Sequence, residues 1–434
     1  IGRMGALYVH RHRLGCGYLY GMSTVITWKV RTMLDQETLP LEAAPFLDIS
    51  DPNYSIRSPE VRAAREQSWY ARTPYGLAVL RYEEMSKLLI HKSLRQGSHA
   101  WPELNGVETG LFSDWWKNTI LVTEGQDHRR LRRLVNPAFS PKTVKGLMEN
   151  FERITNELID GFIDKGQCDF MADFADPYAA RILTHLIGLP QEVSQDILAL
   201  SSEMGLALGV TFKENLDKIE NATAKIYAFV DEVIERRLIE PGDDILSMLA
   251  SASVGGDSLS RDELRNMAVM LAFAGVDTTR NQLGLGLSMF MDHPEQWEHL
   301  AADPSLDMAA SNECMRTRPT ITWVSREAIE DFEFRGLEIK TGTTLHLFSE
   351  SAGTDPSAFP DAQFDITVTR ERNFGFGAGM HVCLGQMVAK NDMAVAYRLL
   401  SQRIKAPKVN GTPVSLPDSG NTGWIHLPIA FEKR

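Results

Sequence analysis

The chain has 434 residues and an ordinary globular composition, with 43% hydrophobic and 24% charged residues. Its formal net charge of −12 argues against a nucleic-acid-binding protein, which would normally carry a basic domain or tail. No apolar run approaches the ~18 residues of a membrane-spanning helix, so no membrane span is predicted. The four cysteines are scattered and contain no CxxC pair. This pattern predicts neither a zinc site nor a disulfide framework, and it favours a reducing, cytoplasmic setting.

The first 21 residues differ in character from the rest of the chain. They contain Arg3, Arg11 and Arg13 but no hydrophobic stretch or cleavage site typical of a signal peptide. The chain does not begin with Met, whereas Met22 is followed by Ser-Thr-Val, as at a natural start. We expect residues 1–21 to be upstream or vector-derived, and residues 22–434 to form one domain.

The first half of the chain predicts helices with a few strands. Residues 76–82 alternate as a strand, and a helix is predicted over 83–91. Between residues 93 and 118 the periodicity is lost, although the segment is rich in tryptophan. Because long irregular segments often act as lids or binding loops, we expect a functional loop here.

A basic helix is predicted after Glu124. His128 and Arg132 are four residues apart and therefore share one face of it. Such a charged run is more often a solvated surface than a site. Ser140 and Pro141 then suit the start of a second helix, which should extend to Gly166. Further helices are predicted over residues 177–187, 191–208 and 215–239.

One long helix is predicted from a capping box at Ser260 and Glu263 to about Asp292, before Pro294. Its middle, residues 274–280, reads Ala-Gly-Val-Asp-Thr-Thr-Arg and interrupts an otherwise apolar stretch. Since Gly, Asp and Thr weaken or bend a helix, the pattern by itself fits a kink or a buried, satisfied Asp as well as a site.

The most informative stretch is residues 374–385, where closely spaced glycines precede Cys383. Glycine tolerates the positive φ angles of a tight bend, and a helix is predicted to begin just after Cys383. Free amides at a helix start favour an anion, so this position favours a thiolate. For a lone cysteine near glycines, a buried and inert role would be the usual interpretation.

Residues 376–385 read Phe-Gly-x-Gly-x-His-x-Cys-Leu-Gly. This pattern resembles the haem-binding loop of the cytochrome P450 family. Three earlier segments agree with it in order: the His-x-x-x-Arg helix, the Ala-Gly-x-Asp-Thr-Thr segment, and Glu-x-x-Arg at 313–316. The resemblance covers about residues 35–434. It implies a mostly α fold with small β-sheets, the single triangular domain of cytochromes P450.

The resemblance also implies a haem-thiolate monooxygenase that inserts one oxygen atom of O2 into a hydrophobic small molecule by hydroxylation or epoxidation. Its cofactor would be haem b (iron protoporphyrin IX), with Cys383 as the iron ligand. Asp277 and Thr278 would manage proton delivery. The residues implied to bind the cofactor are His128, Arg132, Ala274, Arg326, Phe376, Gly377, His381, Cys383 and Gly385.

Two alternatives to an O2-dependent monooxygenase are a peroxide-driven enzyme and a non-catalytic haem-thiolate sensor or carrier. The Asp277–Thr278 pair argues against both, because a mere binder has no need of a proton relay and peroxide-driven relatives often lack the acid–Thr pair. No flavin or nicotinamide fingerprint is present, so electrons are expected from a separate ferredoxin-type donor. Arg129, Arg130 and Arg133 are expected to form its positively charged docking face. The substrate stays open among terpenoids, steroids, aromatics and fatty-acid derivatives.

Some residues depart from the family pattern. Gln363 stands where an arginine often completes a network with Glu313 and Arg316, and residues 351–355 lack the usual Asn-Arg before Asp355. These departures concern the scaffold behind the haem more than its chemistry.

Overall fold

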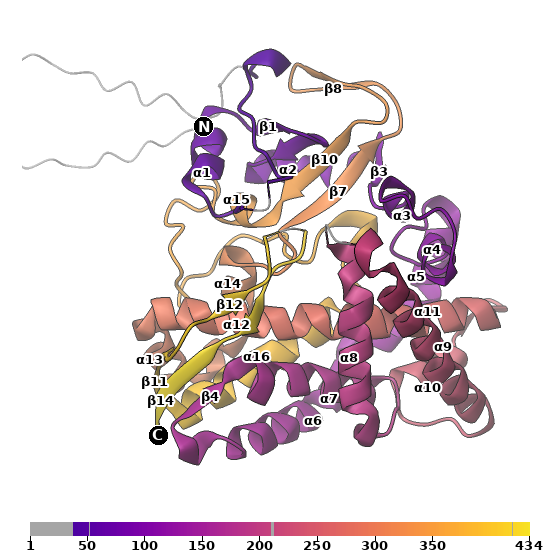
Figure 1. Cartoon of the computed structure of the whole chain (residues 1–434), viewed down its shortest axis with the longest axis vertical. Coiled ribbons are helices and arrows are strands. Elements are labelled where there is room, and N and C mark those ends of the chain that lie inside the picture. The colour runs from indigo at the N-terminus through magenta and orange to yellow at the C-terminus, as the bar shows by residue number, and fades with distance from the viewer. Residues whose placement is uncertain (1–37, 52, 210–211, 419) are drawn as a thin grey trace, which may run out of the picture. The chain divides into compact units, whose positions relative to one another are not determined.

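A pair of collinear helices, α11 (Arg261–Gly275) and α12 (Asp277–Asp292), forms the axis of the helical part of the protein. In the computed structural model they follow one line, with the five-stranded sheet on one side and α6, α7 and α16 on the other (Figure 1). The predicted capping box is present, with Ser260 accepting from the Glu263 amide and Glu263 accepting from the Ser260 amide. The predicted long helix is divided into two at Val276, within the segment 274–280 whose sequence was compatible with a kink.

The structure describes residues 38–434 except 52, 210–211 and 419. The expected terminal segment 1–21 lies outside the described residues, and a single domain over 22–434 stays a prediction. The remaining helices are α1 (Pro59–Gln67), α2 (Tyr82–Leu88), α3 (Trp101–Leu104), α4 (Leu111–Lys117), α5 (Gly125–Val135), α6 (Pro141–Asp160), α7 (Asp176–Leu186), α8 (Ser194–Gly205), α9 (Leu216–Ile239), α10 (Ile245–Ala250), α13 (Pro294–Ala302), α14 (Asp307–Thr317), α15 (Ser349–Gly353) and α16 (Gln386–Arg403).

The strands form small sheets, so the predicted fold class, mostly α with small β-sheets, is confirmed. The largest sheet has the order β1-β2-β10-β7-β3, and a second has the order β11-β14-β4. The strands are β1 (Tyr70–Thr73), β2 (Gly76–Val79), β3 (Leu94–Gln96), β4 (Gln167–Asp169), β5 (Ser253–Val254), β6 (Asp257–Ser258), β7 (Trp323–Ala328), β8 (Phe332–Phe334), β9 (Leu337–Ile339), β10 (Thr344–Phe348), β11 (Ile404–Val409), β12 (Val414–Ser415), β13 (Trp424–His426) and β14 (Pro428–Lys433).

Most predicted helices are present with shifted ends. Ser140 caps α6 by accepting from the Thr143 amide, and Pro141 occupies the first turn, as predicted. The helix ends at Asp160 rather than Gly166, which instead closes a following turn with φ 65°.

The expected functional loop over residues 93–118 is wrong in its structure. The segment contains β3, α3 and α4, and its aromatic side chains belong to the core. Phe112, Trp115 and Trp116 are at most 1% exposed. Their rings contact Phe273 of α11, with centroids 5.3 Å apart for Trp115. Each indole N–H donates to a backbone carbonyl, so these large side chains are buried without a polar penalty. Within the residues that the structure describes, no helix has the length and apolarity needed to cross a membrane.

Candidate functional site

The Cys383 loop has the predicted tight bend. Gly377 and Gly379 have φ angles of 67° and 72°, which side-chain-bearing residues rarely adopt. The Cys383 amide donates to the Phe376 carbonyl at 3.0 Å, which closes the loop just before α16. Gly385 is different, because its φ is −81° and an added Cβ would meet no protein atom within 4 Å. Neither the backbone conformation nor a protein contact requires glycine at position 385. A flat group lying against the loop would require it, because a side chain would occupy the same space.

The thiol of Cys383 differs from the other two described thiols. Cys314 is buried and Cys168 is half-buried, whereas Cys383 is exposed at the end of its loop. Dense surrounding protein still raises the pKa of Cys383 through loss of hydration, against the amides of Gly385 and Gln386 and the charge of Arg132. The prediction that the helix start favours a thiolate correctly identified the amides that lower the pKa, but it overlooked burial, which raises the pKa by more. A bound metal ion would still make Cys383 a thiolate, because metals deprotonate coordinating thiols.

Four basic residues named from the sequence converge beside this loop. The rings of His128 and His381 stack with centroids 4.3 Å apart and planes 10° from parallel. Arg132 donates to the Val382 carbonyl at 2.9 Å, which ties α5 to the residue before Cys383. Arg326 on β7 adds its positive charge, which helps to lower the pKa of His381 after the main effect of burial.

The two arginines of this cluster lack an ion-pair partner among the described residues, whereas His381 is paired with Glu124. Burial lowers the pKa of Arg132 and of Arg326, and within the described residues neither guanidinium forms an ion pair. Burial also lowers the pKa of His128 to about 4, and its Nδ1 is buried without a hydrogen-bond partner. A cluster of this kind is suited to bind carboxylates of a ligand.

Glu124 is the acidic member of this group, and no sequence pattern had assigned it a role. Its Oε1 lies 3.0 Å from Nε2 of His381 and accepts from the Gln96 amide at 2.7 Å. Glu124 thus links the start of α5 to both β3 and the Cys383 loop. Its position four residues before His128 on a predicted helix was the only signal that the sequence carried.

The break between α11 and α12 exposes a short stretch of an otherwise buried helix. Ala274 is exposed although Ala272, Phe273 and Val276 around it are buried. The hydroxyl of Thr278 donates to the Ala274 carbonyl at 2.8 Å. Asp277 instead accepts from Arg280 at 2.8 Å, so the acid and the hydroxyl have separate partners.

Comparisons with known proteins agree on the family. The cytochrome P450 family model matches residues 194–423. Luteothin monooxygenase of Streptomyces thioluteus is 36% identical, covering 89% of this chain and 96% of that protein. Mycinamicin IV hydroxylase/epoxidase of Micromonospora griseorubida is 31% identical, over 90% and 98%. The structure of P450BioI with an acyl carrier protein ligated to hexadec-9Z-enoic acid has a TM-score of 0.80 at 26% identity, covering 88% of this chain and 98% of that one.

The chain belongs to the cytochrome P450 family. Its fold is the P450 fold, and it is a haem-thiolate monooxygenase of the bacterial type, as predicted. The family's cofactor is a haem iron, and the residues present fit it. Gly385 leaves room for a flat macrocycle, and Arg132 and Arg326 offer charge without an ion-pair partner to two propionates.

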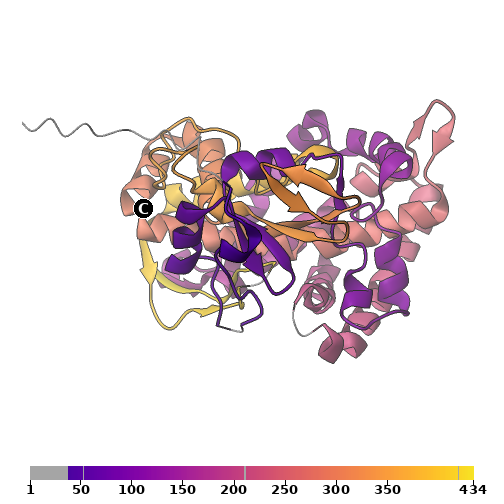
Figure 2. The ribbon, with the colours of Figure 1, turned by 90° about the horizontal axis from the view of Figure 1, so that it is seen from above.

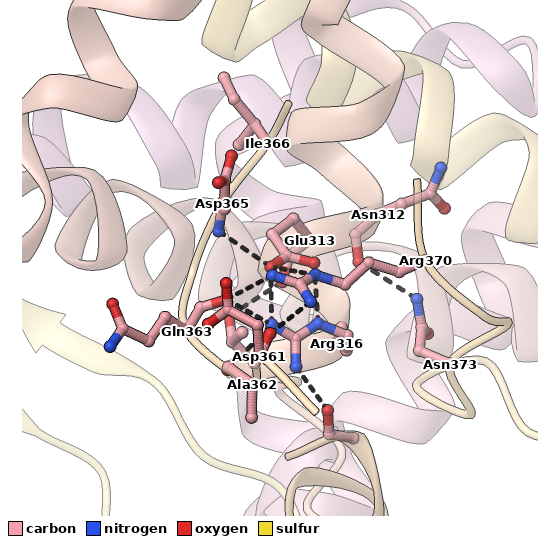
Figure 3. A network of polar contacts seen from close by, with 12 residues as sticks. Asn312, Glu313, Arg316, Asp361, Ala362, Gln363, Asp365, Ile366, Arg370 and Asn373 are labelled. Carbon is pink, nitrogen blue, oxygen red and sulfur yellow. Dashed lines mark hydrogen bonds and ion pairs between the residues drawn. The ribbon is translucent and has the colours of Figure 1, made fainter. Parts of the chain in front are cut away.

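The scaffold behind this P450 site is completed by an unexpected residue. Glu313 and Arg316 form the predicted ion pair, at 2.6 Å, and both side chains are buried. Arg370 is the third member of this network, because it donates to Glu313. The Gln363 side chain extends away from the network, and residue 363 contributes only its backbone carbonyl, which accepts from Arg316 and Arg370 (Figure 3). The departure at Gln363 therefore leaves the network complete. At the other departure, the missing Asn-Arg in residues 351–355, a guanidinium comes instead from Arg65 of α1, which donates to the Thr354 hydroxyl at 2.9 Å.

The expected docking face on α5 is smaller than predicted. Arg130 is bound by Asp257 at 2.9 Å and by Glu263 at 2.5 Å, and Arg133 pairs with Asp257 at 3.1 Å. Asp257 belongs to the β5–β6 hairpin, which projects at one edge of the molecule (Figure 2). Arg133 is exposed, as expected of part of this group, but its charge and that of Arg130 are paired with residues far along the chain. Arg129 is exposed.

Proposed function

We propose that this P450 holds haem b with Cys383 as the proximal iron ligand. The observation that carries the proposal is the convergence of α5, β7 and the Cys383 loop, which places an exposed thiol beside basic side chains that include two arginines without an ion-pair partner among the described residues. Arg132, Arg326, His128 and His381 would bind the propionates through charge-assisted hydrogen bonds. Phe376, Gly377 and Gly385 would contact one side of the macrocycle, and Ala274 would lie against the other.

Bound haem iron would supply O2 activation with two electrons, and the protein would supply binding and protons. Thr278 carries a hydroxyl beside the exposed Ala274, where its Oγ1 can hold and pass a proton. Asp277 is the adjacent acid and can take up a proton at its carboxylate. Together they support an O2-dependent enzyme over a sensor or carrier, which has no need of a proton relay, and over a peroxide-driven enzyme, since relatives of that kind often lack the acid–Thr pair.

The substrate is proposed to be a hydrophobic small molecule, with polyketides as the first class to test. Relatives are named for luteothin, for mycinamicin IV and for polyketide biosynthesis, the last being PksS of Bacillus subtilis, which is 30% identical over 74% of this chain. Trp101 of α3 donates to the carbonyl of Ala207 at 2.6 Å, so the tryptophan-rich segment lies beside the end of α8. We further propose a ferredoxin-type donor and a cytoplasmic location.

The test begins with the holoprotein and a panel of polyketides, steroids and fatty acids. A substrate should shift the ferric Soret band toward high spin. That compound should then give a product containing one atom of ¹⁸O from ¹⁸O2 when NADH, ferredoxin and reductase are present. Product formation from peroxide alone, at an equal rate, would instead support the peroxide-driven alternative.

A further inference from the structure

Both carboxylate oxygens of Asp277 are held by side chains. Arg280, three residues along the same helix, binds Oδ1 through Nε at 2.8 Å and through its terminal nitrogen at 2.7 Å. Asn421, in the C-terminal segment 144 residues away, donates from Nδ2 to Oδ2 at 2.9 Å. The carboxylate therefore cannot rotate without losing a hydrogen bond from one side or the other.

Arg280 is itself fixed by a second acid. Its guanidinium binds Asp176 of α7 at 3.2 Å and is only 13% exposed. Burial raises the pKa of Asp176, and Arg280 opposes that change. Since Arg280 lies between two acids, it cannot follow Asp277 to another position without leaving Asp176 buried and unpaired.

The Asn421 amide is oriented from its other end. The Thr320 hydroxyl lies 2.8 Å from Oδ1 of Asn421 and 2.7 Å from the Thr422 carbonyl, so its single proton is shared between these two acceptors. The backbone of Thr422 donates to the Thr320 carbonyl at 2.9 Å. An ionised carboxylate can only accept hydrogen bonds, so Nδ2 must be the atom that faces Asp277. Thr320 is held in turn by Gln282 of α12, which accepts from its amide at 2.8 Å. These hydrogen bonds therefore connect three parts of the chain to one another: α12, the segment that leads to β7, and the C-terminal segment.

We propose that Asn421 is a positioning residue that holds the Asp277 carboxylate in the orientation for proton uptake. The inference rests on the proposed role of Asp277 in proton delivery. It extends that role to a residue outside the helix that carries the acid, and to the Thr320 hydroxyl that orients it.

The test compares Asn421→Ala with wild-type holoenzyme and with Asn410→Ala. Asn410 is a second asparagine in the C-terminal part of the chain, and its amide contacts only Gln167, at 3.2 Å, among the described side chains. In Asn421→Ala, substrate affinity from the spin shift should stay within about twofold, while product formed per NADH falls by about fivefold. The solvent deuterium isotope effect on kcat should rise, which a purely structural defect would not cause. Asn410→Ala should match wild type in all three measurements.

Asp277→Asn separates the two proposals. If the single variant Asp277→Asn leaves the coupling of NADH consumption to product unchanged, the proposed role of Asp277 fails. If it uncouples the enzyme while Asn421→Ala does not, the positioning inference is overturned. The double variant should lose no more coupling than Asp277→Asn alone. A readout without turnover is the free energy of unfolding of wild type, Asp277→Asn, Asn421→Ala and the double variant. The effects of the two substitutions should be non-additive, and additive effects would also overturn the inference.

Discussion

Arg370 binds Glu313 through Nε at 3.1 Å, on the same carboxylate oxygen that accepts from Arg316. The Asp365 amide donates to that oxygen as well, at 3.0 Å. Glu313 thereby joins α14 to the segment that leads into the Cys383 loop. The position of that loop should therefore depend on the Arg370 side chain.

Replacing Arg370 with Met should lower the free energy of unfolding by about 2 kcal/mol, because Glu313 would stay buried with one guanidinium fewer. Haem loss to apomyoglobin should also become faster. Gln363→Ala is the matched control, since residue 363 contributes only its carbonyl, and it should change stability by less than about 0.5 kcal/mol. A larger effect of Gln363→Ala than of Arg370→Met, measured by urea unfolding, would contradict the assignment.

The sequence predicted those parts of the site whose residues lie close together in the chain. The loop at 376–385, the pair His128 and Arg132, and the acid beside Thr278 all form local patterns with a chemical meaning. Arg370 and Asn421 form no such pattern, because their partners are 57 and 144 positions away. Only the folded chain brings these groups together.

Fold predictions failed where short elements or distant charges were involved. Helices α3 and α4 have four and seven residues, too few to show a hydrophobic period. Their tryptophans suggested a ligand-binding loop, although they pack in the core. Similarly, Arg130 was expected to contribute to a positively charged docking face, and its pairing left no sign in the sequence because Asp257 and Glu263 come more than 120 residues later.

Cys383→Ser should abolish the red-shifted Soret band of the reduced CO complex, because a serine hydroxyl would not replace the thiolate as iron ligand. Cys168→Ser is the control, since burial raises the pKa of that thiol to about 12. The absorbance spectrum of each dithionite-reduced, CO-saturated protein decides the matter. Survival of the red-shifted band in Cys383→Ser would disprove the ligand assignment.

Thr278→Ala should leave NADH and O2 consumption within about twofold of wild type while peroxide replaces most of the product. The substitution removes the hydroxyl that donates to the Ala274 carbonyl and leaves a small side chain in its place. Peroxide, product and NADH are measured in the same reaction. Thr279→Ser, at the buried neighbouring position, keeps a hydroxyl and should stay coupled. Unchanged coupling in Thr278→Ala would favour the simpler view of residues 274–280 as a helix kink.

Arg129→Glu should slow the first electron transfer from an acidic ferredoxin by about three- to tenfold at low ionic strength, with substrate affinity unchanged. Arg129 is exposed, whereas Arg130 and Arg133 are bound to Asp257. Arg236→Glu, at an exposed position on α9, is the control for a change in total charge. Stopped-flow reduction at several salt concentrations measures the effect, which should fade as screening increases. Equal rates for both variants and wild type at low salt would remove α5 as the docking surface.

His346 should make the protein less stable in mild acid. It is 8% exposed, its Nε2 is buried without a hydrogen-bond partner, and burial lowers its pKa to about 4. An unfolded histidine has a pKa near ~6.5, so between pH 4 and 6.5 the unfolded state binds more protons than the native state. The stabilisation is therefore complete above about pH 6.5 and is lost as the pH falls toward 4. Urea unfolding followed by circular dichroism should show wild type losing about 2 kcal/mol more than His346→Leu over that interval. The difference between the two proteins at pH 7.5 gives the packing change alone, and an equal loss in both would show that His346 contributes nothing to the acid sensitivity.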